Sequence, residues 1–390
     1  MCQYLYAFHR NLFFFLWMLG LFGSGCSPSI PKIPIKGELA GQHIDTTVDS
    51  EIARYYLESY LQNNRTNPSF DLKIDQVNHF PMQTLPDREY LTYLARTYSV
   101  DFATLYFMKR ISESESDHRI VRSFHEIYSK AKHAGDLNYS TFLPQASAYL
   151  FLFAPSWLYK TNPYTGADFA KIRKLLDKLG LHSQLIETEE SGAVETNAKI
   201  IAQELLRLKC LHKRIILISA SKSGPEVAQA LGEYLSPDQT SHIKAWMNIS
   251  GVLQGSQLAD SALTWPVSWK VRSHFSSKGW DIAGLESVTS KRSRKRFEHL
   301  RFPDHLLIIN YLGIPLSGNI NKPGWKGYLN LRHGGPNDGR TYLLDAIIPG
   351  AITIPQFGFD HYLWDPDLDL KVTALLQTLI QYLEPSTCVR

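Results

Sequence analysis

From residue 147 onward, short apolar runs alternate with segments whose apolar residues recur every three or four positions. The runs have the length and composition of buried strands: "AYLFLFAP", "HSQLIET", "RIILISA", "HIKAWMNIS", "HLLIINYLG" and "GAITIPQ". The longer segments have the period of amphipathic helices: "GADFAKIRKLLDKLG", "AVETNAKIIAQELLRL", "EVAQALGEYL" and "DLKVTALLQTLIQYLE". This alternation predicts an α/β domain over residues 147–390, with a mostly parallel sheet covered by helices on both faces.

The preceding part of the chain has a different pattern. Over residues 49–146 the apolar residues recur at helical spacing, most clearly in "EIARYYLESYL", "REYLTYLARTY" and "VDFATLYFMKRI". We expect a helical extension here with a packing role, because it carries no catalytic signal. Residues 26–48 begin with the Pro-, Ser- and Gly-containing stretch "SPSIPKIPIKGELAGQ", which predicts a flexible tether.

The N-terminus carries a targeting pattern. His9 and Arg10 precede "NLFFFLWMLGLFG", an apolar run too short to span a bilayer comfortably, which predicts a signal peptide over residues 1–25. The "GSGC" that follows resembles the cleavage site of bacterial lipoproteins, although Gly23 stands where that pattern prefers leucine. The resemblance implies lipid attachment at Cys26, with simple cleavage or an uncleaved anchor as alternatives. Ser27 is not an acidic retention signal, which favours an outer membrane anchor facing the periplasm.

Composition narrows the functional classes. With 390 residues, 44% of them hydrophobic, the chain can bury a large core. Lysine and arginine number 41 against 37 aspartates and glutamates, a balance that gives no reason to expect nucleic acid as a partner. Four cysteines without metal-binding spacing predict no zinc site. No cofactor is predicted, and nothing indicates the oligomeric state.

The stretch "RIILISASKSGPEVAQAL" carries the clearest chemical signal. A serine nucleophile on a sharp turn between strand and helix needs small residues two positions before and after it. Ser221 meets this condition, with Ser219 and Ser223 on either side, whereas Ser219 follows Leu217 and Ser223 precedes Pro225. The positive end of the following helix would face Ser221.

In the order of their predicted strands and helices and in the turn at Ser221, residues 147–390 resemble the α/β-hydrolases of the lipase and esterase type. The usual turn is G-x-S-x-G, and serines replace both glycines here. The resemblance implies a triad in the order Ser, Asp, His. It places the base after the last strand, where His361 follows the predicted strand end at Gln356 by five residues. Competing histidines stand in less favourable places: His299, His305 and His333.

The resemblance also implies the acid and the oxyanion hole. Asp338, in an N-D-G turn 23 residues before His361, resembles the acid of lipases in which that residue comes late; Asp345 and Asp360 are alternatives. One oxyanion donor would be the Lys222 amide. The other would come from "PSWLY", where Pro155 has no N–H, which leaves Ser156 or Trp157.

An insertion over residues 261–301 stands where this family carries a cap. Its aromatic side chains would line an acyl pocket or pack against the core: Trp265, Trp269, Phe275 and Trp280. It ends in the basic stretch "KRSRKRFEHLR", interpreted either as a solvated helix face or as a contact with anionic lipid headgroups.

The sequence therefore predicts a serine esterase or lipase that acts on an ester or lipid substrate through an acyl-enzyme, with membrane attachment through Cys26. The alternative is a catalytically silent hydrolase fold that serves as a binding or scaffolding lipoprotein. The altered turn and the less certain acid favour that alternative.

Overall fold

The computed structural model describes residues 30–77, 85–113, 118–134, 139–211 and 214–384. The predicted signal peptide, 1–25, and the predicted lipidation site at Cys26 lie outside these residues. Within the described ranges, no helix is both long and apolar enough to cross a lipid bilayer.

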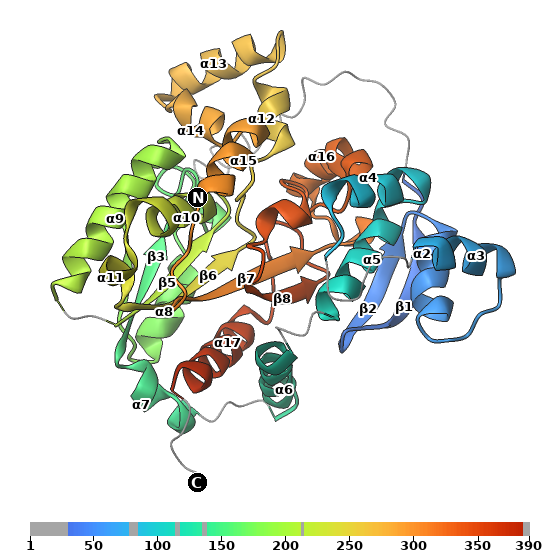
Figure 1. Cartoon of the computed structure of the whole chain (residues 1–390), viewed down its shortest axis with the longest axis horizontal. Coiled ribbons are helices and arrows are strands. Elements are labelled where there is room, and N and C mark those ends of the chain that lie inside the picture. The colour runs from blue at the N-terminus through green and yellow to red at the C-terminus, as the bar shows by residue number, and fades with distance from the viewer. Residues whose placement is uncertain (1–29, 78–84, 114–117, 135–138, 212–213, 385–390) are drawn as a thin grey trace, which may run out of the picture.

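A six-stranded sheet forms the centre of the molecule, in the order β4-β3-β5-β6-β7-β8 (Figure 1). All neighbouring strands pair in parallel. Each strand falls in an apolar run that the sequence assigned to a strand, which confirms the predicted parallel sheet. The strands are β3 (Tyr149–Ala154), β4 (Ser183–Leu185), β5 (Arg214–Ala220), β6 (Ile243–Ile249), β7 (Leu307–Ile314) and β8 (Ile352–Phe357).

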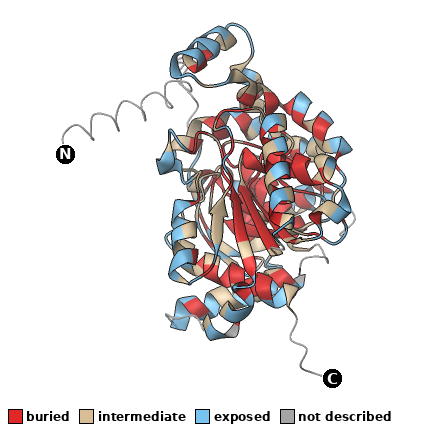
Figure 2. Cartoon of the chain, turned by 90° about the vertical axis from the view of Figure 1, so that its left-hand side faces the viewer, coloured by how far each residue is buried: buried red, intermediate tan, exposed pale blue. Residues whose placement is uncertain are grey.

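Helices cover both faces of this sheet. The central strands are the most buried part of the molecule (Figure 2). Strand alternation on β5 separates the two cores: Ile215 and Leu217 pack under one set of helices, Ile216 and Ile218 under the other. The first set comprises α9 (Val194–Lys209) and α10 (Ser223–Gln229). The second comprises α6 (His118–Ala134), α8 (Ala170–Lys178) and α17 (Leu368–Leu383).

Four helices between β6 and β7 rise above the carboxyl ends of the strands, and we call them the cap (Figure 1). They are α12 (Gln257–Ala262), α13 (Val267–Lys278), α14 (Ile282–Ser287) and α15 (Ser290–His299). Much of the basic stretch on α15 is held in ion pairs: Arg292 and Arg296 with Glu195, and Arg294 with Asp345. The basic stretch is therefore not simply a solvated face.

The prediction of a flexible tether over residues 26–48 is wrong for residues 33–48. These form a hairpin of β1 (Ile33–Leu39) and β2 (Gln42–Val48). Residues Ile35, Leu39, Ile44 and Val48 all point into the core, at the two-residue spacing of strands. Pro34 and Gly37 stand at strand positions of β1, and Gly41, with φ +72°, stands in the turn; Pro31 precedes β1.

The segment after the hairpin is helical, as predicted, but it is not an independent appendage. Its apolar side chains up to Ile111 share one core with residues of β7, β8 and the loops between them, such as Ile314 and Phe357, whereas those of α6 pack on the central sheet. Buried Asp101 accepts hydrogen bonds from Ser317 N and Tyr328 Oη at 2.8 and 3.0 Å. The helices are α2 (Glu51–Tyr55), α3 (Pro68–Val77), α4 (Arg88–Thr97) and α5 (Val100–Ser112), followed by α6.

Short elements complete the described chain. They include the α-helices α7 (Leu143–Ala146), α11 (Pro237–Thr240) and α16 (Lys322–Leu331), the π-helical turns η1 (Tyr56–Tyr60) and η5 (Ala230–Tyr234), and the 3₁₀ turns η3 (Tyr139–Thr141), η4 (Pro163–Thr165), η6 (Ser317–Asn319), η7 (Arg332–Gly334) and η8 (Leu343–Ala346).

Candidate active site

Ser221 occupies a strained turn between β5 and α10. Its φ is +52°, in the left-handed region that residues with a side chain rarely adopt. Three backbone hydrogen bonds hold this conformation: Ser221 N donates to Ile249 O at 3.1 Å, and Ser221 O accepts from Gly224 N at 3.1 Å and from Val252 N at 2.9 Å. Strain of this kind at the end of a central parallel strand is typical of a nucleophile that must stand clear of the backbone.

The two serines that replace the usual glycines form part of the turn's support. Ser219 Oγ accepts a hydrogen bond from Trp246 Nε1 at 2.9 Å. Ser223 Oγ donates to Ala154 O at 2.8 Å and accepts from Ala220 N at 2.9 Å. Both serines are fully buried, so these contacts satisfy hydroxyls that burial would otherwise penalise. The departure from glycine is thus compatible with a closed turn.

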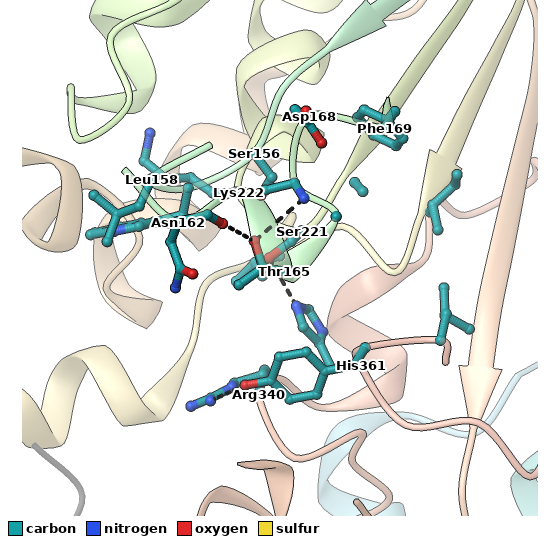
Figure 3. Close-up of a pocket in the computed structure, with 18 of the residues that line it drawn as sticks. Ser156, Leu158, Asn162, Thr165, Asp168, Phe169, Ser221, Lys222, Arg340 and His361 are labelled. Atoms are coloured by element: carbon teal, nitrogen blue, oxygen red, sulfur yellow. Dashed lines mark hydrogen bonds between the residues drawn. The ribbon is translucent and has the colours of Figure 1, made fainter. Parts of the chain in front are cut away.

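The structure brings Ser221, His361 and Asp338 together (Figure 3 shows the first two). His361 Nδ1 lies 2.7 Å from Asp338 Oδ2, and His361 Nε2 lies 2.8 Å from Ser221 Oγ. A carboxylate can only accept a hydrogen bond, so Nδ1 of His361 carries a hydrogen and donates a hydrogen bond to Asp338. Nε2 of the neutral ring is then the acceptor for the Ser221 hydroxyl.

Asp338 is oriented by its own turn. The side chain is fully buried, and its Oδ1 accepts from Arg340 N at 2.8 Å and Thr341 N at 2.9 Å. His361 N donates to Asp338 O at 3.0 Å, which ties the two loops together through the backbone. Gly339, with φ +88°, supplies the left-handed residue of the N-D-G turn. Asp338 therefore presents one oxygen to the turn and the other to the imidazole.

The competing acids and bases lie elsewhere. Asp345 pairs with Arg88 at 2.6 Å and with Arg294 at 3.7 Å. Asp360 accepts from Asn321 N at 2.8 Å. Within the described residues, the cavity beside Ser221 is lined by His361 and by none of His299, His305 and His333.

The candidate oxyanion donors differ in whether their backbone N–H already donates a hydrogen bond within the protein. Ser156 N already donates to Ala167 O at 2.8 Å, so this amide is occupied, and the suggestion that Ser156 supplies the second donor is not supported. Among the described residues, the Lys222 and Trp157 amides donate to no group of the chain. Both residues line the cavity beside Ser221. Lys222 and Trp157 are therefore the better pair of donors for a developing negative charge.

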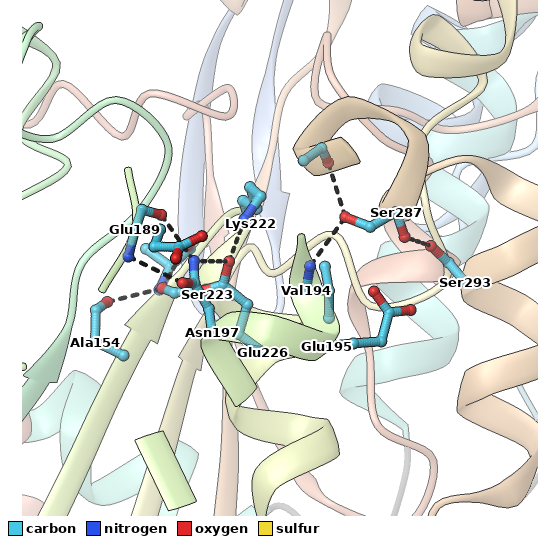
Figure 4. A network of polar contacts seen from close by, with 12 residues as sticks. Ala154, Glu189, Val194, Glu195, Asn197, Lys222, Ser223, Glu226, Ser287 and Ser293 are labelled. Carbon is cyan, nitrogen blue, oxygen red and sulfur yellow. Dashed lines mark hydrogen bonds and ion pairs between the residues drawn. The ribbon is translucent and has the colours of Figure 1, made fainter. Parts of the chain in front are cut away.

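A buried ion pair that was not predicted from the sequence involves the side chain of Lys222. Lys222 is 3% exposed, and its ammonium pairs with Glu226, which is 1% exposed, one helical turn along α10 (Figure 4). Asn197 Nδ2 donates to Glu226 Oε1 at 2.9 Å. Burial raises the pKa of Glu226, and the Lys222 ammonium opposes that shift. The spacing of four residues on a predicted helix was the available signal.

The Lys222 side chain also reaches the other oxyanion candidate. Its Nζ lies 5.6 Å from the centroid of the Trp157 ring, within the range of a cation–π contact. Trp157 in turn packs edge-on against Phe275 of the cap, with ring centroids 6.2 Å apart. The Lys222 ammonium thus contacts both the Glu226 carboxylate and the Trp157 ring.

A cavity of about 1090 Å³ opens at Ser221 and His361. Most of its lining side chains are apolar and come from the sheet, α8, α17 and the cap. Two of the four cap aromatics, Phe275 and Trp280, line it; Trp265 and Trp269 are instead 83% and 69% exposed. Such a cavity beside three convergent polar groups has the character of a small-molecule site.

No protein-family model matches the chain, and no curated protein matches it. The strand order, the strained serine and the Ser, Asp, His order along the chain agree with one architecture. The fold is an α/β-hydrolase fold. Solved structures similar to this chain include the metagenomic carboxyl esterase MGS0156, at 19% identity and a TM-score of 0.47, covering 61% of this chain and 76% of that one.

Two further solved structures are similar to parts of this chain. The mature Bacillus licheniformis lipase BlEst2 is 16% identical with a TM-score of 0.45, covering 61% of this chain and 89% of the lipase. Phospholipase PlaB from Legionella pneumophila is 13% identical with a TM-score of 0.35, covering 51% of this chain and 45% of PlaB.

Proposed function

We propose that this protein hydrolyses carboxylic esters through a covalent acyl-enzyme on Ser221. The observation that supports this most directly is the unbroken hydrogen-bond relay from Ser221 Oγ to His361 and on to buried Asp338. A serine hydroxyl is a weak nucleophile unless a base stands beside it and a third group orients that base. All three positions are filled here, at distances of 2.8 and 2.7 Å.

In the proposed mechanism Ser221 Oγ attacks the ester carbonyl while its proton passes to His361 Nε2. Asp338 holds the ring in the tautomer that accepts this proton and stabilises the imidazolium. The amides of Lys222 and Trp157 donate to the oxyanion. His361 then gives its proton to the departing alkoxide, and the bond between the acyl carbon and the alcohol oxygen breaks. Water, deprotonated by His361, releases the acid and restores Ser221.

Hydrolysis of p-nitrophenyl butyrate by the full chain, purified in detergent, tests the proposal. Ser221→Ala should remove the activity, leaving at most the roughly 10³–10⁴-fold acceleration that binding and the oxyanion hole retain in other serine enzymes. Ser261→Ala is the matched control, because this serine lines the same cavity at an exposed position. Equal, low rates for the wild type and both variants would instead support the silent scaffold.

We also propose that the chain is a lipid-anchored protein of the bacterial envelope, held through Cys26 in the outer membrane and facing the periplasm. The proposal rests on the small residues before Cys26 and the apolar run before them. A single acyl chain gives only marginal membrane binding, so stable attachment through this cysteine would need more than one chain.

A further inference from the structure

The residues that line the cavity at Ser221 fall into two groups that come from different elements. One part, the inner arm, lies between the sheet and the helices α8 and α17. The other part, the cap arm, lies among the helices α12, α13 and α14. Ser221 and His361 belong to the same cavity and stand at the end of the sheet, between the two arms.

The inner arm is lined by side chains from one face of the sheet. On β5 these are Ile216, Ile218 and Ala220, alternate residues that point the same way. Opposite them lie Leu176 on α8 and side chains of α17. These neighbours are apolar and most are buried, so this part of the cavity favours an apolar group. The α17 side chains are Leu368, Lys371, Val372, Leu375, Leu376 and Leu379, and the Lys371 ammonium is paired with Asp365 at 2.6 Å.

The cap arm is equally apolar but has separate walls. Ala259 of α12 and Val271 of α13 line it, together with Leu285 and Val288. Trp157 also lines the cavity and packs against Ala259 and Val288 in one apolar cluster. This apolar cluster also contains Leu285 and, from α9, Val194, and among the described residues none of α8, α17 or β5 belongs to it.

We propose that the natural substrate is a lipid ester with a long apolar chain on each side of the ester bond, one chain in each arm. This inference rests on the proposed function, because it requires the ester carbonyl at Ser221. The carbonyl stands where the arms meet, so the acyl and alcohol parts leave it in different directions. A volume of about 1090 Å³ lies just above the roughly 300–1,000 Å³ typical of small-ligand pockets, as two chains would require.

The sheet geometry sets a depth for the inner arm. Ile216 lies four residues before Ala220, or about 13 Å at about 3.3 Å per residue. An extended hydrocarbon advances about 1.3 Å per carbon, given C–C bonds of about 1.5 Å. The inner arm therefore accepts a chain of roughly ten carbons along β5. A phenylalanine at position 218 would block the inner arm about 7 Å nearer to Ser221 than a phenylalanine at position 216.

Four esters in detergent micelles test the proposal with the full chain: ethyl butyrate, ethyl decanoate, decyl butyrate and decyl decanoate. We expect kcat/KM to rise at least about tenfold when either side is lengthened, and further when both are, because each buried methylene favours binding. Ile218→Phe should abolish the gain from lengthening one side of the ester, and Val271→Phe the gain from lengthening the other. Ile216→Phe should shorten the accepted chain by only a few carbons.

Controls separate this inference from the proposed function. Ile308→Phe adds the same ring to a strand residue outside the cavity, packed against the opposite core, and should leave the chain-length profile unchanged. Hydrolysis of ethyl butyrate by all variants would show that the catalytic residues remain active. If that activity persists while Ile218→Phe and Val271→Phe both remove the gain in kcat/KM for the same side of the ester, or remove it for neither side, the two-arm substrate is refuted. If no ester is hydrolysed and Ser221 is unreactive, the proposed function itself fails.

Discussion

Removing Glu226 should destabilise the protein severely, while replacing the whole ion pair should not. Lys222 and Glu226 are 3% and 1% exposed, and Asn197, which donates to Glu226, is also buried. Glu226→Ala leaves the Lys222 ammonium without a partner in a low-dielectric interior. Breaking a buried pair in this way costs about 3–5 kcal/mol, a large share of the roughly 5–15 kcal/mol that holds a typical protein folded.

The double variant Lys222→Met/Glu226→Leu removes both charges and keeps the apolar volume. Its free energy of unfolding should be equal to the wild type or about 1–4 kcal/mol higher. Asn197 Nδ2 still has a partner there, because it also donates to Glu189 O at 2.9 Å. Urea unfolding followed by tryptophan fluorescence measures all three free energies. A loss below about 1 kcal/mol in Glu226→Ala, or a double variant as unstable as the single one, would refute the reasoning.

Three further predictions concern other parts of the chain. Asp338→Asn should lower kcat by up to about 10⁴-fold, because the imidazole then loses the tautomer that accepts a hydrogen bond from Ser221. Circular dichroism should show that the fold is retained. A kcat within tenfold of the wild-type value would contradict this role of Asp338. Burial lowers the pKa of His125 to about 4, so the unfolded chain binds a proton first and the folded state loses stability as pH falls from about 6.5 to 4. Unfolding of His125→Gln should show a smaller loss across that window, and an unchanged pH profile would argue against it. Cys26→Ser should abolish incorporation of labelled palmitate in a bacterial host, whereas Cys210→Ser, at an exposed cysteine of the folded part, should not.

The pattern of apolar residues was sufficient for the sheet, because parallel strands buried on both faces appear as continuous apolar runs. It failed for residues 33–48, where Ile35, Ile44 and Val48 alternate with polar residues over a stretch that also carries Pro and Gly. A two-residue alternation over seven positions is a short signal. What decided the structure was the shared core with β7 and β8, a long-range contact that no local pattern contains.

The candidate site was partly predictable for a similar reason. The turn chemistry pointed to Ser221, and the resemblance to the α/β-hydrolases implied Asp338 and His361, whose loops meet Ser221 at the carboxyl ends of the strands. The choice between Ser156 and Trp157 depended on a hydrogen bond to Ala167 that arises from loop geometry. The two arms of the cavity depend on gaps between packed helices, which follow from tertiary packing and leave no periodic trace in the sequence.

The most direct test of the central claim is reaction of the full chain with a fluorophosphonate, with the adduct mapped by mass spectrometry. An activated serine attacks the phosphorus and displaces fluoride, which leaves a stable phosphonate ester on its oxygen. The account predicts a single adduct on Ser221, absent from Ser221→Ala and strongly reduced in His361→Ala. A folded wild-type protein that shows no labelling, or labelling that persists in Ser221→Ala, would contradict it.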